Sequence, residues 1–465
     1  MNVHFIAIGG SAMHSLALAL AGRSGTTVTG SDDAIFEPSR SRLAAAGLLP
    51  EAEGWFPERI HSGLDAVVLG MHARSDNPEL LKAQDLDLPV YSYPEYVQKA
   101  CERQTRVVVG GSHGKTTTTS LIASVLAEGG EDPTFVIGGR LKSAGTNARL
   151  GAGRYLVAEA DESDASFLHL QPLIAVVTNI DNDHLGTHDG DFNRLRQSFV
   201  DFLHNLPFYG LAVLCVDDAE VRGILDRVGR PVTTYGLSAA ADVRAVDIER
   251  KGLQTGYTVL RKGGAAPLTV TVNLPGTHNV LNSLAAIAVA SELGITDAAI
   301  QSGLARFQGV DRRLQFVGEL ATGTGKAVLI DDYGHHPTEI RATLEAVRQA
   351  YPGRRVVLAF QPHRYTRTRD LLDDFAAVLA TADVLLVSEV YAAGEAPIAG
   401  ADGRAICRAV RSRGQAEPVF LSRIEDLPDA LRGLLHADDV VLAMGAGNVS
   451  AVAHDLPRHF GGGGA

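Results

Sequence analysis

Apolar, β-branched runs alternate with longer segments of helical periodicity along most of the chain. In the first hundred residues this pattern predicts strands at 3–8, 26–30 and 65–71, and a helix at 12–22 between the first two. Alternation of this kind is typical of parallel sheets that are covered by helices. We therefore expect the chain to begin with an α/β domain.

The same alternation continues through two further blocks. The second block, about 105–310, has buried-type strand runs, a region at 240–275 that suggests short antiparallel strands, among them 257–260 and 268–272, and a helix predicted at 277–293. Its other strands are predicted at 134–137, 155–158 and 174–179, and those of the third block at 327–330, 355–360, 384–390 and 440–444.

The length of 465 residues is too great for one hydrophobic core. We predict an α/β protein of three domains. These are a Rossmann-like nucleotide-binding domain at 1–103, a central P-loop-type ATPase domain with a mixed sheet at 104–311, and a Rossmann-like domain at 312–465.

The amino-acid composition limits the kinds of molecule that the protein could bind. The net charge is −12, from 42 basic and 54 acidic residues, which argues against nucleic acid or an anionic membrane surface as partner. No apolar stretch approaches the ~18 residues of a membrane-spanning helix. The three cysteines lack metal-binding spacing, as in a reducing compartment. We expect a cytoplasmic protein, monomeric or homodimeric, that acts on small molecules.

A glycine-rich segment at 110–119, Gly-Gly-Ser-His-Gly-Lys-Thr-Thr-Thr-Thr, separates a predicted strand from a predicted helix. Backbone N–H groups of such a loop bind phosphate, with Lys115 reaching the β- and γ-phosphates and Thr116 binding Mg²⁺. The spacing departs from the strict P-loop pattern, because Gly110 lies four residues before Gly114 instead of five. A plain strand-to-helix turn is the alternative.

Two polar segments follow strands of the same block. Residues 158–164 hold four carboxylates, and residues 179–184 read Asn-Ile-Asp-Asn-Asp-His. Oxygen ligands with one imidazole suit Mg²⁺ or Mn²⁺. A solvated acidic turn and a structural His184 are the alternatives.

In the first block, Gly9-Gly10 follows the first predicted strand, and Gly30-Ser31-Asp32-Asp33 stands at the end of the second. A glycine turn followed by an acidic residue after the next strand outlines a nucleotide-binding βαβ unit.

The third block adds basic and histidine-rich segments. Arg312-Arg313 could clamp a phosphoryl group or form a surface pair. Residues 331–337 (Asp-Asp-Tyr-Gly-His-His-Pro) are expected to end its first strand, and residues 361–369 (Gln-Pro-His-Arg-Tyr-Thr-Arg-Thr-Arg) its second. Arginines at strand ends suit a carboxylate-bearing substrate. The histidine pair could instead bind zinc.

Together these motifs resemble the Mur ligase family. The resemblance rests on residues 111–118, 159–167, 179–184, 276–282, 331–337 and 360–367, and it is near-continuous from about 111 to 450. Within the family it is strongest to the members that add L-alanine to UDP-N-acetylmuramate. The first ~110 residues, in particular 7–15 and 69–78, resemble instead the recycling members that attach a ready-made tripeptide.

The resemblance implies a reaction and a set of site residues. ATP would phosphorylate the lactyl carboxylate of UDP-N-acetylmuramate, and L-alanine would attack the acyl phosphate to form an amide in peptidoglycan synthesis. Catalytic roles would fall to Lys115, Arg313, Asp332 and His335. ATP would contact Gly111, Ser112, His113, Gly114, Lys115, Thr116, Thr117, Asn279, Asn282, Arg313 and Asp332.

The remaining implied residues divide among the metal and two substrates. The Mg²⁺ (or Mn²⁺) ligands would be Thr116, Glu159 and His184. The UDP-sugar would contact Gly9, Gly10, Ser11, Ser31, Asp32, His72, Asp161, Glu162 and Ser163. L-alanine would contact Tyr333, His335, His363, Arg364 and Arg367.

Three other functions remain open at this point. The chain could ligate the L-Ala-D-Glu-diaminopimelate tripeptide to UDP-N-acetylmuramate. A folate-type polyglutamate ligase would share the nucleotide machinery but not the first block. A P-loop switch or binding ATPase would need neither the third block nor its His-Arg-Tyr-Thr-Arg segment.

Overall fold

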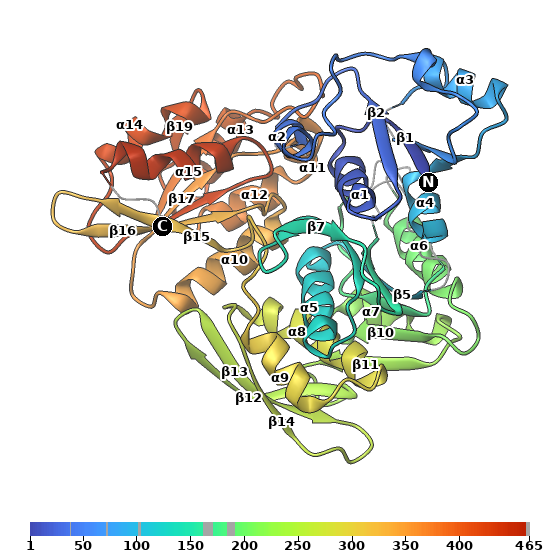
Figure 1. Ribbon diagram of the computed structural model, residues 1–465. Helices are drawn as coiled ribbons and strands as arrows, with labels where there is room; N and C mark the ends of the chain where they lie inside the picture. Colours follow the sequence, from blue (N-terminus) through green and yellow to red (C-terminus); the bar gives the residue numbers. More distant parts are fainter. Residues whose placement is uncertain (38, 71–72, 101–103, 161–170, 184–190, 462–465) are drawn as a thin grey trace. The chain divides into compact units, whose positions relative to one another are not determined.

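The computed structural model describes residues 1–37, 39–70, 73–100, 104–160, 171–183 and 191–461; the side chains of residues 11, 12, 94, 98 and 100 are also outside the description. The described strands form three sheets of four, ten and six strands (Figure 1). This confirms the predicted α/β class with a mixed central sheet. None of the described helices is long and apolar enough to cross a membrane.

The chain folds into two compact units, which are described separately. The first comprises Met1–Val246, Val259–Leu268 and Leu281–Gln308. The second comprises Asp247–Thr258, Thr269–Val280 and Gly309–Ala465.

The four-stranded sheet is parallel throughout and has the order β2-β1-β3-β4. Its strands are β1 (Asn2–Ile6), β2 (Thr27–Ser31), β3 (Ala66–Leu69) and β4 (Val90–Ser92). The helices around it are α1 (Ser11–Ala21), α2 (Ser39–Ala45), α3 (Pro78–Asp85) and α4 (Tyr93–Ala100), with a short 3₁₀ turn η1 (Pro57–Arg59). Apolar residues of α1 and α4 pack on one face together with Leu156 and Ala158, and α3 packs on the other.

The ten-stranded sheet has the order β14-β13-β12-β11-β10-β9-β5-β8-β6-β7. Its strands are β5 (Thr105–Gly110), β6 (Thr134–Leu141), β7 (Thr146–Arg149), β8 (Tyr155–Glu159), β9 (Ile174–Val177), β10 (Leu211–Cys215), β11 (Val232–Gly236), β12 (Val243–Lys251), β13 (Gln254–Arg261) and β14 (Leu268–Val272). The central pairs are parallel, and β7 runs antiparallel to β6. Parallel pairing brings the carboxyl ends of β5, β8 and β9 to one edge, where the phosphate loop and Glu159 lie.

Helices cover the central strands. Phe199 and Phe202 of α6 (Phe192–His204) and Ile224 of α7 (Ala219–Ile224) pack on Val108 and Val177. The remaining helical elements are α5 (Lys115–Glu128), η4 (Leu225–Arg227), α8 (Thr277–Glu292) and α9 (Asp297–Ala305). Helix α5 lies against β5, β6, β8 and α9 (Figure 1). Because α5 is buried on nearly all sides, its sequence lacks the polar stripe of a surface helix.

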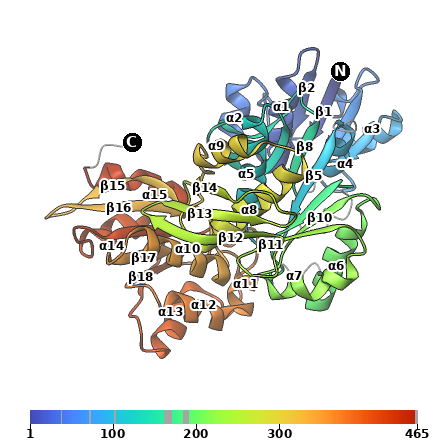
Figure 2. The same ribbon diagram turned by 90° about the horizontal axis from the view of Figure 1, so that it is seen from below.

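The six-stranded sheet of the second unit has the order β15-β16-β20-β17-β18-β19. Its strands are β15 (Gln315–Ala321), β16 (Lys326–Asp332), β17 (Val356–Phe360), β18 (Val384–Ser388), β19 (Val419–Leu421) and β20 (Val440–Met444). On one face lie α10 (Pro337–Ala350), α12 (Leu372–Leu379) and α13 (Gly403–Ser412), and on the other lie α14 (Leu427–Arg432) and α15 (Val449–His459), as Figure 2 also shows. Helix α11 (Tyr365–Asp370) follows β17, and a 3₁₀ turn η5 (Ile424–Asp426) precedes α14.

The prediction that residues 327–330 form the first strand of the third block is wrong. Strand β15 precedes them and pairs antiparallel with β16, which itself extends to Asp332. Strand β15 mixes polar and apolar residues around Gly318, where the register shifts, so it gives only a weak strand signal. Asp331 and Asp332 are therefore the last two residues of β16. Beyond the end of β17, residues Tyr365–Asp370 form helix α11.

Candidate active site

The loop between β5 and α5 has a backbone that requires glycine at two positions. Gly111 and Gly114 have φ values of +131° and +82°. A Cβ atom at Gly111 would lie 2.0 Å from Oγ1 of Thr178, and one at Gly114 would lie 2.6 Å from Oδ1 of Asn282. The loop therefore forms a tight turn at the amino end of α5, as an anion-binding loop does.

Lys115 is the first residue of α5 and reaches back over the loop. Its Nζ donates to the carbonyl oxygens of Gly111 (2.7 Å) and Ser112 (3.3 Å). The side chain is half-buried, whereas we expected an exposed one. Its ammonium group thus lies within the turn, where phosphate oxygens would compete for it.

Thr116 and Glu159, two of the predicted metal ligands, bring their side-chain oxygens together at the amino end of α5. The Thr116 hydroxyl donates to Oε1 of Glu159 at 3.0 Å. Oε2 of Glu159 accepts from the Gly138 N–H at 2.7 Å, which orients the carboxylate. The third predicted metal ligand, His184, lies outside the described residues.

The segment 179–183 supports the loop. Asn179 brackets His113, since its Oδ1 accepts from the His113 N–H (2.8 Å) and its Nδ2 donates to the His113 carbonyl (2.9 Å). Nε2 of His113 lies 2.9 Å from Oδ2 of Asp181. These side chains, which looked from sequence like further metal ligands, hold the phosphate loop to the end of β9.

The two asparagines predicted to face adenine lie one turn apart on α8. Asn282, in the first unit, is buried, and its Oδ1 accepts from the Thr118 hydroxyl at 3.2 Å. Thr117 is buried nearby in α5. Asn279, in the second unit, is buried and donates through Nδ2 to the Pro275 carbonyl at 2.8 Å.

In the four-stranded sheet, Asp32 organises the predicted UDP-sugar turn. Its Oδ2 accepts from the Gly9 N–H at 2.7 Å, and its Oδ1 accepts from the Ala34 N–H at 3.3 Å. Burial raises the pKa of Asp32, against the lowering effect of these hydrogen bonds. The Ser31 carbonyl accepts from the N–H groups of Ala7 and Ile8, and the Ser31 side chain is buried.

Gly10 precedes α1, which begins at Ser11. The side chain of Ser11 and the predicted contacts His72, Asp161, Glu162 and Ser163 lie outside the described residues.

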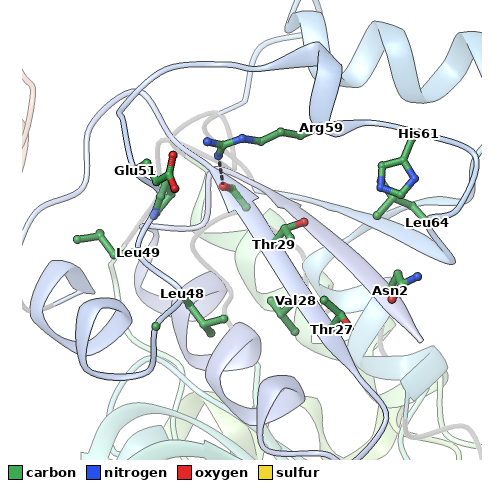
Figure 3. A pocket seen from close by; sticks show the side chains of 13 residues that line it. Asn2, Thr27, Val28, Thr29, Leu48, Leu49, Glu51, Arg59, His61 and Leu64 are labelled. Atoms are coloured by element: carbon green, nitrogen blue, oxygen red, sulfur yellow. Dashed lines mark hydrogen bonds between the residues drawn. The ribbon is translucent and has the colours of Figure 1, made fainter.

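A separate cavity of about 630 Å³ lies over β2, between residues 47–51 on one side and residues 59–64 on the other. Figure 3 shows Leu48, Leu49 and Glu51 on one side and His61 and Leu64 on the other, with Arg59 donating to the Gly30 carbonyl. None of the predicted UDP-sugar residues lines this cavity, so it is distinct from the glycine turn.

In the second unit, Asp332 is a buried carboxylate at the end of β16. It accepts from the backbone N–H groups of Leu314 and Gly334, each at 2.8 Å. Burial raises the pKa of Asp332 to about 6, although Arg313 and the two N–H groups act to lower it.

Glu339 connects several of the predicted residues. Its Oε2 accepts from the His335 N–H at 2.8 Å, and its Oε1 lies 3.7 Å from Nη1 of Arg313. His336 caps α10 by accepting from the Thr338 N–H, with Glu339 completing a capping box. One member of the histidine pair, His336, thus has a structural role at the start of α10.

A ring cluster forms the predicted amino-acid end of the site. Tyr333 and His335 are in edge contact with centroids 5.2 Å apart, and His335 and His363 follow at 5.5 Å. His363 stacks on Tyr391 at 5.7 Å with an interplanar angle of 9°. Arg312 and Arg313 lie over the Tyr333 ring at 4.8 and 5.1 Å.

The two arginines that we expected to converge on one carboxylate differ in environment. Arg367 is buried, with Nη1 3.3 Å from Nδ1 of His363, whereas Arg364 is exposed. Arg364 precedes α11 with φ +70° and ψ 136°.

Sequence reasoning missed Glu339 and Tyr391. The first follows His336 by three residues, which is the spacing of a capping box and could have drawn attention to it. Tyr391 lies after β18 with no pattern of its own, and only the tertiary structure brings it to His363.

A glycine turn between β5 and α5, next to the Thr116–Glu159 pair at the carboxyl ends of parallel strands, is the arrangement typical of nucleotide-binding proteins of the P-loop type. Three family descriptions match the sequence: "Mur ligase family, catalytic domain" at residues 2–105, "Mur ligase middle domain" at 109–290 and "Mur ligase, glutamate ligase domain" at 312–447. The chain belongs to the Mur ligase family.

Relatives within the family are similar over the whole chain. A UDP-N-acetylmuramate–L-alanine ligase of Methylococcus capsulatus is 53% identical over 460 residues, covering 99% of this chain and 96% of its own. The structure of a UDP-N-acetylmuramate-alanine ligase from Thermotoga maritima superposes with a TM-score of 0.80 at 28% identity, covering 99% of both chains.

A murein peptide ligase from Psychrobacter arcticus gives a TM-score of 0.70 at 26% identity, again over 99% of both chains. The 53% match includes the first domain, whose sequence we expected to resemble the tripeptide-attaching members.

Proposed function

We propose that the protein joins L-alanine to the lactyl carboxylate of UDP-N-acetylmuramate with hydrolysis of ATP. The products are UDP-N-acetylmuramoyl-L-alanine, ADP and phosphate, in the cytoplasmic stage of peptidoglycan synthesis. The observation that carries this proposal is the 53% identity, over nearly the whole chain, to a ligase named for this reaction.

The phosphate loop fits the ATP half of the reaction. The N–H groups of Gly111–Thr117 and the start of α5 would hold the nucleotide phosphates. Lys115 would leave the loop carbonyls and neutralise charge on the transferring phosphoryl group. Transfer to the lactyl carboxylate gives an acyl phosphate, which activates that carbon for attack by an amine.

The oxygen pair of Thr116 and Glu159 fits a hard divalent cation such as Mg²⁺ or Mn²⁺, because both donors are oxygens and they lie 3.0 Å apart. His184 would complete the ligands. Mg²⁺ supplies charge neutralisation during phosphoryl transfer when it is bound. Glu159 would exchange its hydrogen bond from Thr116 for the cation while keeping the one from Gly138.

The UDP-sugar would lie over the Gly9-Gly10 turn, which Asp32 orders. Its other contacts would come from Ser11, Ser31, His72, Asp161, Glu162 and Ser163. In open α/β sheets such ligands bind beyond the carboxyl ends of the strands, and this turn follows β1.

The second unit would supply the amine-acceptor end. Tyr333, His335, His363, Arg364 and Arg367 would form the L-alanine subsite, with Arg367 as a buried cation for the carboxylate. Arg313 and Asp332 would contact the nucleotide, together with Asn279 and Asn282. Glu339 orients Arg313 and the backbone of His335.

Phosphate release from ATP tests the proposal. We expect release to require UDP-N-acetylmuramate and L-alanine together. Release with neither substrate would indicate a P-loop ATPase, and release with glutamate and a folate would indicate a polyglutamate ligase. Competition between L-alanine and the L-Ala-D-Glu-diaminopimelate tripeptide at limiting UDP-sugar decides between the two family activities.

A further inference from the structure

Tyr391 lies among the residues of the proposed acceptor subsite although no sequence pattern points to it. We propose that Tyr391 is a positioning residue of that subsite: it holds the His363 ring and the Arg364 backbone in the arrangement that receives the amino acid. This inference rests on the proposed function, because it assigns a role within the L-alanine site.

The backbone of Tyr391 pairs with the segment that carries the acceptor residues. Its N–H donates to the Pro362 carbonyl at 2.8 Å, and its carbonyl accepts from the Arg364 N–H at 2.9 Å. The two hydrogen bonds form a parallel bridge between His363 and Tyr391. The loop after β18 is therefore joined to the loop after β17 at this bridge.

That point is the strained part of the segment. Arg364 has φ +70° and ψ 136°, a conformation that side-chain-bearing residues rarely adopt. Such a conformation is unfavourable and persists only where surrounding contacts impose it. The hydrogen bond from Arg364 to Tyr391 is one of the contacts that impose it.

The side chain of Tyr391 fixes the next residue. Its ring stacks on His363 at 5.7 Å with an interplanar angle of 9°. On the loop after β20, a Cβ atom at Gly447 would lie 2.7 Å from Cγ of Tyr391, so the ring base packs directly on that glycine. Arg312 donates to the Gly445 and Gly447 carbonyls and holds this support in place.

The same loop also holds the start of α11. Glu395 accepts from the N–H and the hydroxyl of Thr366, at 3.0 and 2.6 Å. Arg364 is thus held by Tyr391, and Arg367 directly follows Thr366, which is held by Glu395. Tyr391 is nevertheless 41% exposed, so part of its surface remains available to the amino acid in the subsite.

Steady-state kinetics of Tyr391→Ala, Tyr391→Leu and Tyr391→Phe test the role. Alanine removes the stack and the packing on Gly447, leucine keeps apolar bulk without a flat ring, and phenylalanine keeps the ring. We expect the L-alanine KM to rise about tenfold or more in the first two variants and to stay near the wild-type value in the third. The KM values for ATP and UDP-N-acetylmuramate should remain within about twofold in all three.

Phe316→Ala is the matched control, because Phe316 is an aromatic residue of the same unit that is 45% exposed on β15. Its kinetic constants should not change. Three results would overturn the inference: an unchanged L-alanine KM in the alanine and leucine variants, a parallel rise of all three KM values, or a phenylalanine variant as impaired as the alanine variant. A wild-type enzyme that does not consume L-alanine would instead overturn the proposed function, and this inference with it.

Discussion

The hydroxyl of Thr116 lies 3.0 Å from Oε1 of Glu159, a residue 43 positions further along the chain. The pairing arises because β5 and β8 are parallel neighbours, so the start of α5 and the end of β8 meet at one edge of the sheet. Two side-chain oxygens, which we propose as metal ligands, are thereby placed beside the glycine loop by the topology of the sheet.

Glu159→Gln should lower turnover and raise the Mg²⁺ concentration needed for half-maximal rate. The amide keeps an acceptor for the Gly138 N–H but removes the negative charge that a divalent cation requires. Rates measured across a Mg²⁺ titration check this. Glu128→Gln, at the far end of α5, is the control, and an equal effect there would remove the metal role.

Lys115→Ala should lower kcat by about two orders of magnitude or more, because the ammonium group would no longer neutralise the negative charge on the transferring phosphoryl group. Thermal unfolding should change little, since the Nζ contacts with the Gly111 and Ser112 carbonyls lie within a single loop. A loss of less than about tenfold would show that Lys115 does not act in phosphoryl transfer.

Asp332→Asn should change how stability depends on pH. Burial raises the pKa of Asp332 to about 6, facing Arg313 and Glu339. Between about pH 4 and pH 6 the unfolded chain loses the carboxyl proton while the folded chain retains it, so the wild type loses stability as pH rises. The variant lacks this titration.

The free energy of unfolding of the variant, minus that of the wild type, should therefore rise by about 2 kcal/mol from pH 4 to pH 7. Urea unfolding at a series of pH values measures the difference. A difference that is flat across this range would mean that the carboxyl titrates normally in the folded protein.

Ala7→Gly should stabilise the first domain by up to about 1 kcal/mol. Ala7 has φ +66°, which is costly for a residue with a Cβ atom, and the gain is partly offset by the greater freedom of glycine when unfolded. Chemical denaturation checks the sign. Ala19→Gly in α1 should do the opposite, because its backbone is helical.

Arg367→Ala should raise the L-alanine KM strongly with little effect on the UDP-N-acetylmuramate KM. The buried guanidinium beside His363 is the expected partner of the amino-acid carboxylate. Kinetics with each substrate varied in turn give both constants. Equal changes in the two would place Arg367 outside the acceptor subsite.

Sequence reasoning predicted many of the strands with strong apolar character. Strands β14 and β20 have the predicted bounds, and most of the other predicted strands differ by one to four residues, because buried β-branched runs define a strand directly. Strands β4, β7, β10, β11, β15 and β19 were not predicted. Strands β15 and β19 have exposed residues in the run, whereas β10 is buried throughout and was missed in spite of its apolar sequence.

The site was predictable where motifs are local and not where it depends on distant contacts. The phosphate loop could be recognised because Gly111, Gly114 and Lys115 act within a few residues of one another. The contacts of Asp181 with His113 and of Tyr391 with His363 depend on how the ends of different strands are brought together. No pattern within a single sequence specifies that arrangement.

The backbone of Arg364 has a consequence for how this protein could be altered. A glycine there would adopt φ +70° without steric cost, so Arg364→Gly should make the fold more resistant to heat. It would also remove one of the two cations at the acceptor end. Selection for thermal stability therefore favours glycine at residue 364, whereas selection for ligation favours arginine. Libraries that are screened only for survival at high temperature should accumulate inactive glycine variants at residue 364.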